Sequence, residues 1–332
     1  MDLTTTCMGL TLRNPLVVGA SPLSDDVGMV RALEDAGAGA VVMHSLFMEQ
    51  LAWEQDAMLR DVVAHEHGFA EALTYAPEPV GYALGPEEYL EQVARLKAAV
   101  DIPVIGSLNG THTGDWTHYA ALIEQAGADG LELNVYYLPL DGAEPPDAVE
   151  ERFLSVLAAV RAEVSIPVSM KLTSFFSSPI HLARRLEKAG ATGFALFNRL
   201  FPADIDIDEL EIHATLHLSD PFILGVRLLW LAAMFGQVEA SLAVSGGVHE
   251  TSDVIKAVMA GASTVQMASV LLRRGPKHLA RLHRELRAWM EEHEYAALSE
   301  LHGSMSRQRC PDPDAWERGN YLRTLQQWRP GQ

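Results

Sequence analysis

Short apolar runs alternate with longer amphipathic stretches along most of the chain. The tripeptide Ala-Gly-Ala occurs four times, at residues 36–38, 126–128, 189–191 and 260–262, each time after an amphipathic stretch and before an apolar run. Glycine enters the left-handed backbone region without a Cβ penalty and therefore commonly ends a helix. Each copy of the tripeptide predicts a junction between a helix and a strand.

A second repeated motif, Ile-Pro-Val, marks strand entries at residues 102–104 and 166–168. Proline is tolerated at the first residue of a strand, where its missing N–H costs little. The two motifs together predict eight strands, at residues 16–20, 40–44, 103–108, 130–134, 168–172, 193–197, 242–245 and 264–267. Helices are expected at residues 26–35, 86–99, 116–125, 147–162, 179–188, 227–235, 251–259 and 277–293.

Eight apolar strands that alternate with helices favour a (β/α)8 (TIM) barrel, with an open doubly wound sheet as the alternative. Residues 3–13 are expected to form a hairpin at the barrel floor, and residues 45–85 and 198–224 to form long rim loops after strands 2 and 6. We expect one barrel domain at residues 1–303. Residues 304–332 then form a tail whose apolar positions have helical spacing, as in a packed or interface helix.

The composition limits the kinds of partner that the protein can bind. The chain has 44 acidic and 25 basic residues and a net charge of −19, which argues against nucleic acid and anionic membranes as partners. No signal segment begins the chain, and no apolar run is long enough for a membrane span. Two cysteines, Cys7 and Cys310, suit a reducing compartment. We therefore expect a cytoplasmic protein with no membrane anchor.

Glycines at two neighbouring strand ends indicate a phosphate site. Gly246 and Gly247 follow the seventh strand, and Ala268 and Ser269 follow the eighth. In (β/α)8 barrels the loops after strands seven and eight, with a short helix N-terminus, commonly bind phosphate. The alternative is a Gly-Gly turn that serves backbone geometry alone.

Lys171 is a second candidate, because it lies near the carboxyl end of the fifth strand. An ammonium group inside a barrel is costly to desolvate unless it faces an anionic or electron-rich partner. Ser107, Asn134 and Asn198 fall at other strand ends and can supply polar groups to the same rim.

Several of these motifs resemble the dihydroorotate dehydrogenase family. They are Asn14-Pro15 with Ala20-Ser21-Pro22, Leu133-Asn134, Lys171-Leu172 and Ser245-Gly246-Gly247-Val248, in the family's order. The resemblance covers about residues 3–303. It implies FMN as cofactor, oxidation of dihydroorotate to orotate in pyrimidine biosynthesis, and a soluble homodimer; such an enzyme is an FMN-dependent dehydrogenase acting on CH–CH groups.

The resemblance also implies roles for single residues. Lys171 matches the lysine beside flavin N1 and the C2 carbonyl, where its charge stabilises the reduced ring. Ala20 and Ser21 lie beside the ring, and His44 stands in place of a family lysine. The other expected cofactor residues are Ser45, Ser107, Asn134 and Asn198 around the ring, and Gly225, Gly246, Gly247, Ala268 and Ser269 around the phosphate.

The chain departs from the family where the catalytic base belongs. The family supplies Cys or Ser after the fourth strand, and Tyr137 occupies that position here. A phenol, with an ordinary pKa of about 10, is a poor base at neutral pH unless a cation lowers its pKa. Tyr137 is thus a candidate base, and stacking on the ring or shaping the pocket is the alternative. Arg199 replaces a small polar residue and offers a charge to an acidic substrate.

Three other functions stay open from the sequence. The barrel could be an FMN oxidoreductase for another small acidic substrate, or a catalytically silent flavin-binding relative. It could also be a non-redox barrel that binds a sugar phosphate, with Glu132 as an inward carboxylate. No metal is expected, because His65-Glu66-His67 lacks the spacing of a zinc site.

Overall fold

Eight parallel strands form a closed barrel in the computed structural model, which describes residues 1–47, 85–110, 116–200, 204–207, 210–213, 217–313 and 315–327. Going around the barrel, the strands are β3 (Leu16–Val18), β4 (Ala40–Val42), β6 (Val104–Gly110), β7 (Gly130–Val135), β8 (Val168–Leu172), β9 (Gly193–Leu196), β12 (Ser241–Ser245) and β13 (Thr264–Met267). β13 pairs with β3, which completes the ring. The predicted barrel is confirmed, and the open sheet is excluded.

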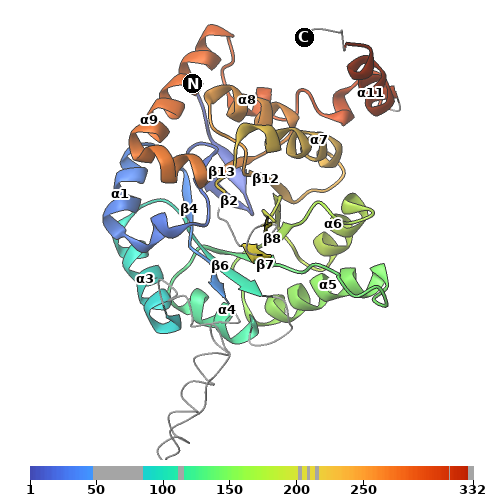
Figure 1. Cartoon of the computed structure of the whole chain (residues 1–332). Coiled ribbons are helices and arrows are strands. Elements are labelled where there is room, and N and C mark those ends of the chain that lie inside the picture. The colour runs from blue at the N-terminus through green and yellow to red at the C-terminus, as the bar shows by residue number, and fades with distance from the viewer. Residues whose placement is uncertain are drawn as a thin grey trace, which may run out of the picture.

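Helices surround the strands on the outside (Figure 1). They are α1 (Val27–Asp35), α3 (Pro86–Ala99), α4 (Trp116–Gln125), α5 (Pro146–Glu163), α6 (Pro179–Lys188), α7 (Leu224–Met234), α8 (Thr251–Ala260) and α9 (Ser269–Glu292). Each packs an apolar stripe against the barrel. In α6, for example, Leu182, Ala183 and Leu186 are buried, at the spacing of one helix face.

The amino-terminal hairpin closes the floor of the barrel, as predicted. Strands β1 (Thr5–Cys7) and β2 (Leu10–Leu12) pair antiparallel around a turn at Met8 and Gly9. A Cβ atom added to Gly193 would lie 2.9 Å from Met8 Cγ, and one added to Gly130 would lie 3.0 Å from Met8 Cε. Because both glycines begin strands, the Met8 side chain fills the bottom of the barrel.

Two helices begin earlier than predicted. α9 begins at Ser269 and not at residue 277, because a short helical segment precedes a kink at Gly275 (φ +66°) and Pro276. Gly275 has a non-helical backbone, so two helical segments meet there, and the second corresponds to the helix predicted at residues 277–293. α7 begins at Leu224, after the short helix η2 (Pro221–Ile223).

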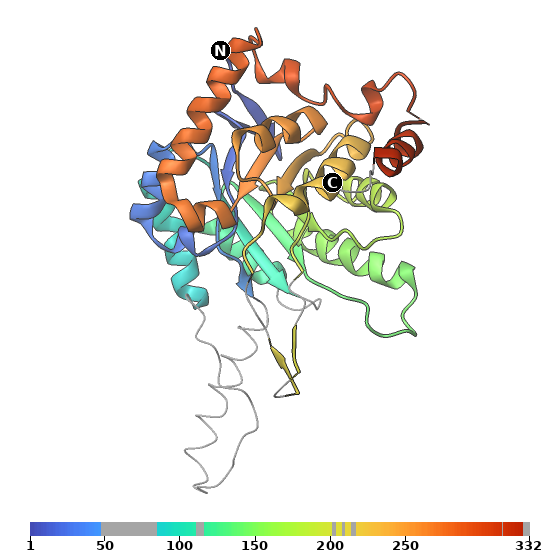
Figure 2. The same ribbon diagram turned by 45° about the horizontal axis from the view of Figure 1, so that its top comes forward.

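The rim carries two strand pairings that the sequence did not predict. β5 (Leu46–Phe47) adds to the edge of β6, and the connection after β9 contains the antiparallel hairpin of β10 (Asp204–Asp206) and β11 (Glu211–His213). Figure 2 shows this hairpin projecting away from the barrel. The predicted rim loop after strand 2 falls largely at residues 48–84, outside the described part of the chain.

The carboxyl-terminal part contains α10 (Leu298–Leu301), η3 (Arg307–Arg309) and α11 (Ala315–Gln327). α11 lies within the predicted tail, and its Tyr321, Leu322 and Leu325 are exposed; whether it packs at an interface stays a prediction. The proposed domain boundary at residue 303 stays a prediction. Within the described residues, no helix combines the length and apolar character that crossing a membrane requires.

Candidate active site

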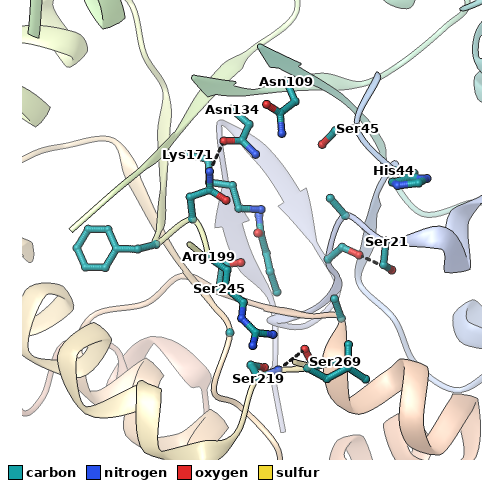
Figure 3. Close-up of a pocket in the computed structure, with 18 of the residues that line it drawn as sticks. Ser21, His44, Ser45, Asn109, Asn134, Lys171, Arg199, Ser219, Ser245 and Ser269 are labelled. Carbon is teal, nitrogen blue, oxygen red and sulfur yellow. Dashed lines mark hydrogen bonds between the residues drawn. The ribbon is translucent and has the colours of Figure 1, made fainter. Parts of the chain in front are cut away.

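A cavity of about 630 Å³ opens at the carboxyl ends of the barrel strands (Figure 3). Its walls come from the strand ends and from the first turns of α7 and α9. In the figure, Lys171 and His44 lie on opposite sides of the cavity, and Ser219 and Ser269 lie at one end. The rim location is the one at which (β/α)8 barrels build active sites.

A buried polar network holds Lys171. Its Nζ lies 3.1 Å from Oε1 of Glu132 on β7, and Glu132 Oε2 accepts a hydrogen bond of 2.6 Å from Gln266 Nε2 on β13. Glu132 is 1% exposed and Lys171 is 8% exposed. The predicted need for an anionic partner is therefore met by Glu132, while the ammonium still lines the cavity. Sequence reasoning considered Glu132 and Lys171 separately and missed their pairing.

Amide and hydroxyl groups line the wall around Lys171. Asn198 Nδ2 donates to Asn134 Oδ1 at 2.6 Å, which fixes both amide groups. The hydroxyls of Ser45 and Ser107 share a hydrogen bond of 2.8 Å. Ser107 is fully buried and does not line the cavity, so it acts by positioning Ser45.

His44 follows β4 and lines the opposite wall. Its Nδ1 lies 3.4 Å from Asp25 Oδ2, and its backbone N–H donates to Ser24 Oγ at 2.7 Å. A carboxylate at Nδ1 orients an imidazole so that the other nitrogen, Nε2, can exchange a proton. The Asp25 contact was not foreseen, because Asp25 lies in the helical turn before α1 and not at a strand end.

The glycine-rich end of the cavity lies between α7 and α9. Gly246 and Gly247 have φ values of +86° and +84°, in the region that favours glycine. A Cβ atom on Gly247 would lie 2.7 Å from the backbone nitrogen of Leu224, so a side chain there would collide with α7. Ser219 N donates to Ser269 Oγ at 3.0 Å and ties the loop before α7 to the start of α9.

Arg227 lies beneath these glycines and is 7% exposed. Its guanidinium donates to the carbonyls of Ser245 (2.5 Å), Ile223 (2.9 Å) and Phe197 (3.4 Å). Burial, and to a lesser extent the nearby charge of Arg199, lowers the pKa of Arg227 to about 10. Both arginines line the cavity. Sequence reasoning missed Arg227, although a lone arginine within the apolar run of α7 was a usable signal.

Comparison with known proteins now gives the family. A family model described as "Dihydroorotate dehydrogenase" matches residues 2–290. The chain belongs to the dihydroorotate dehydrogenase family. Members of this family are FMN flavoproteins and oxidoreductases that act on CH–CH groups.

Individual relatives are similar over nearly their full length. A protein from Thermoplasma volcanium named "Dihydroorotate dehydrogenase B (NAD(+)), catalytic subunit" is 28% identical over 311 residues, which cover 91% of this chain and 98% of that protein. A protein of the same name from Methanothermobacter thermautotrophicus is 26% identical, over 91% of this chain and 97% of that protein. A "Putative dihydroorotate dehydrogenase A (fumarate)" from Aeropyrum pernix is 25% identical, with the same coverage.

The cavity of this dihydroorotate dehydrogenase relative suits FMN in volume and chemistry. One wall carries the Lys171 ammonium, and the other end is formed by a glycine turn at which a side chain on Gly247 would collide with α7. A buried cation suits an electron-rich ring, and a glycine turn beside a helix start suits a phosphate.

The structure brings most of the residues predicted for the cofactor into one cavity. Those that line it are Ala20, Ser21, His44, Ser45, Asn134, Lys171, Asn198, Gly246, Ala268 and Ser269. Ser107, Gly225 and Gly247 lie behind the wall. Residues that line the cavity and were not predicted include Gly19, Asn109, Tyr136, Ser245, Arg227 and Gln266. Whether each of them contacts FMN stays a prediction.

Tyr137 does not line the cavity, although Tyr136 does. The Tyr137 hydroxyl donates to the Glu144 carboxylate, and the Arg152 guanidinium lies 4.0 Å from the centre of its ring. The hydrogen bond to Glu144 raises the pKa of Tyr137 above its ordinary value. This geometry does not support the predicted role as base, and it does not support stacking on a ring in the cavity.

Proposed function

We propose that this chain oxidises dihydroorotate to orotate with FMN as its cofactor, in pyrimidine biosynthesis. The observation that carries the proposal is the buried Lys171–Glu132 pair, which fixes an ammonium at the wall of a cavity with a glycine-rich end. Three relatives named as dihydroorotate dehydrogenases match the chain over nearly its whole length. That agreement favours this substrate over the sugar-phosphate alternative.

The residues that would hold FMN divide into two groups. Lys171, Asn134 and Asn198 line the wall that suits the ring, and Gly246, Ala268 and Ser269 line the end that suits the phosphate. When bound, FMN supplies the hydride acceptor. The Lys171 charge, held in place by Glu132, favours the electron-rich form of such a ring because opposite charges attract strongly at a poorly solvated site.

Loss of hydride from C6 of dihydroorotate must be balanced by loss of a proton from C5. We assign His44 as the base that accepts this proton, because it lines the cavity and because Asp25 Oδ2 lies 3.4 Å from its Nδ1 and orients the ring. Imidazole commonly serves as a general base near neutral pH. His44 would therefore replace the Cys or Ser of the family, since Tyr137 lies outside the cavity.

The deciding experiment mixes the purified flavoprotein with dihydroorotate under anaerobic conditions and follows flavin absorbance. Bleaching of the oxidised band supports the proposal. A protein that does not take up FMN would refute the flavin role. A protein that takes up FMN but is not bleached by dihydroorotate would support FMN as the cofactor and refute dihydroorotate as the substrate.

A second candidate is a different small acidic substrate for the same flavin. The observation that favours it is Tyr136 on the cavity wall, where the family has a smaller base loop, with Arg199 nearby on the wall. Bleaching by another carboxylate with a saturated, oxidisable CH–CH bond, and none by dihydroorotate, would select this candidate.

We also propose a cytoplasmic homodimer. Free thiols at Cys7 and Cys310 suit a reducing compartment. Phe222, Val226 and Leu229 are exposed at the start and outer side of α7, with helical spacing, and they offer an apolar face for a second copy. Several relatives are named catalytic subunits, which implies a separate subunit for those proteins. Light scattering of the purified chain, with Phe222→Glu as the test variant, measures the oligomeric state.

A further inference from the structure

The glycine-rich end of the cavity is unusually cationic for a chain with a net charge of −19. Arg227 and Arg199 both line the cavity and lie close enough for the charge of Arg199 to lower the pKa of Arg227. Arg273, on the adjoining turn of α9, donates to the carbonyls of Leu218 and Ser219 and adds a third positive charge nearby. Like charges repel, so this grouping costs stability unless anions offset it; the Asp220 carboxylate offsets the charge of Arg199.

Arg227 is the most buried of these charges, so leaving its charge unpaired is the most destabilising. It is 7% exposed, and no carboxylate forms a salt bridge with it within the residues that the structure describes. Within the described part of the chain its hydrogen-bond partners are three backbone carbonyls, which leave two of its five N–H groups for another acceptor. A buried cation with neutral partners and spare donors is the arrangement expected of an anion site.

The position of the guanidinium identifies which anion. A Cβ atom on Gly246 would lie 3.4 Å from Arg227 Nη2 and 3.5 Å from Nε, so the guanidinium lies directly against that glycine. Gly246 is one of the residues at the phosphate end of the cavity, and Ser269 begins α9 on the same side. Lys171 belongs to β8 and is engaged by Glu132, so it is tied to the other end.

We propose that Arg227 recognises the phosphate of FMN and makes the cavity select FMN over riboflavin. The inference rests on the proposed flavin function. The planar guanidinium presents paired donors that match phosphate geometry, and its charge is fixed in place by the carbonyls of Ser245, Ile223 and Phe197. Backbone amides alone would bind the phosphate without a full positive charge; Arg227 adds that charge from beneath the glycine turn.

The test compares FMN with riboflavin, which shares the ring and lacks the phosphate. Apoprotein is titrated with each flavin, and quenching of flavin fluorescence gives the two dissociation constants. In Arg227→Gln we expect FMN affinity to fall about 10-fold to 100-fold, because a charge-assisted hydrogen bond is lost. Riboflavin affinity should change less than threefold. Riboflavin serves as an internal control, since general damage to the site weakens both flavins equally.

A matched arginine variant controls for loss of charge elsewhere. Arg184 on α6 donates to Gln237 O and Oε1 and does not line the cavity. Arg184→Gln should leave the ratio of FMN to riboflavin affinity at the wild-type value. An Arg227→Gln ratio that also stays within twofold of wild type overturns the proposal. So does an unchanged ratio with weaker dihydroorotate binding, which would make Arg227 a substrate residue.

If Arg227→Gln does not fold, the proposal is tested with Arg227→Lys, in which phosphorus NMR measures the resonance of the bound FMN phosphate. The lysine keeps a charge but loses the forked donors, so the phosphorus resonance should move from its wild-type position. An unmoved resonance overturns the proposal. Wild-type protein that binds neither flavin refutes the proposed function itself, and the role of Arg227 falls with it. Wild-type protein that binds both flavins equally keeps the flavin role and refutes only the phosphate contact.

Discussion

Removing the carboxylate of Glu132 should destabilise the protein more than breaking any exposed ion pair. The Lys171 Nζ to Glu132 Oε1 distance is 3.1 Å, and the two side chains are 10% and 1% exposed. At an effective dielectric constant of about 20, Coulomb's law gives an attraction of about 5 kcal/mol, which desolvation partly offsets. Glu132→Gln also leaves one oxygen to accept from two donors, Lys171 and Gln266. We expect the free energy of unfolding to fall by about 3 kcal/mol.

A double-mutant cycle measures this interaction directly. The variants are Glu132→Gln, Lys171→Met and the double variant, and urea unfolding of the apoprotein is followed at pH 7. The expected coupling energy is about 2–3 kcal/mol. The control cycle uses Lys97 and Asp129, whose Nζ to Oδ2 distance is only 2.6 Å but whose side chains are both 29% exposed. Exposed pairs contribute about 0–1 kcal/mol.

The two cycles separate burial from distance as the source of the coupling. If the distance between the charged atoms determined the coupling energy, the shorter Lys97–Asp129 pair would show the larger value. A coupling at Glu132 and Lys171 no larger than that of the control would refute the reasoning.

Other variants test the site and the environment of the thiols. His44→Gln, saturated with FMN, should slow anaerobic flavin bleaching by dihydroorotate about 10²-fold to 10⁴-fold, because it removes the proposed base; an unchanged rate would exclude His44 from that role. Tyr137→Phe should leave the bleaching rate within about twofold, because the hydroxyl is bound to Glu144 outside the cavity, and a large loss would contradict the geometry. Burial raises the pKa of Cys7 to about 11, so its reactive thiolate gains population only as the pH rises toward that value. Iodoacetamide at pH 8 should therefore label Cys310 alone, as read by peptide mass spectrometry; labelling of native Cys7 at an equal rate would show that it is not buried.

The strands and most helices could be predicted because their signals are local. Helix ends at Ala-Gly-Ala and strand entries at Ile-Pro-Val depend on neighbouring residues, and β8, β13, α3, α4 and α6 have the predicted bounds. Lys171 was found in the same way, from its place near the carboxyl end of the fifth predicted strand. The last helix was predicted to begin at residue 277, which coincides with the kink at Gly275 and Pro276, where two helical segments meet.

The site residues that escaped prediction depend on contacts between distant segments. Glu132 meets Lys171 across 39 residues of sequence, and Arg227 reaches the Ser245 carbonyl across 18. Tyr137 was placed by its match to a family position, but a glutamate seven residues later captures its hydroxyl. A single sequence shows which residues are available at a rim. It does not show which of their possible partners they contact.

The methionine at the tip of the first hairpin has a kinetic consequence. Met8 packs at the floor of a barrel whose interior is filled by side chains, so the cavity opens at the carboxyl ends of the strands. In the proposed oxidation of dihydroorotate, an electron acceptor that uses this opening would enter after orotate leaves, so that substrate and acceptor bind in turn. Such alternation gives parallel lines in double-reciprocal plots of initial velocity.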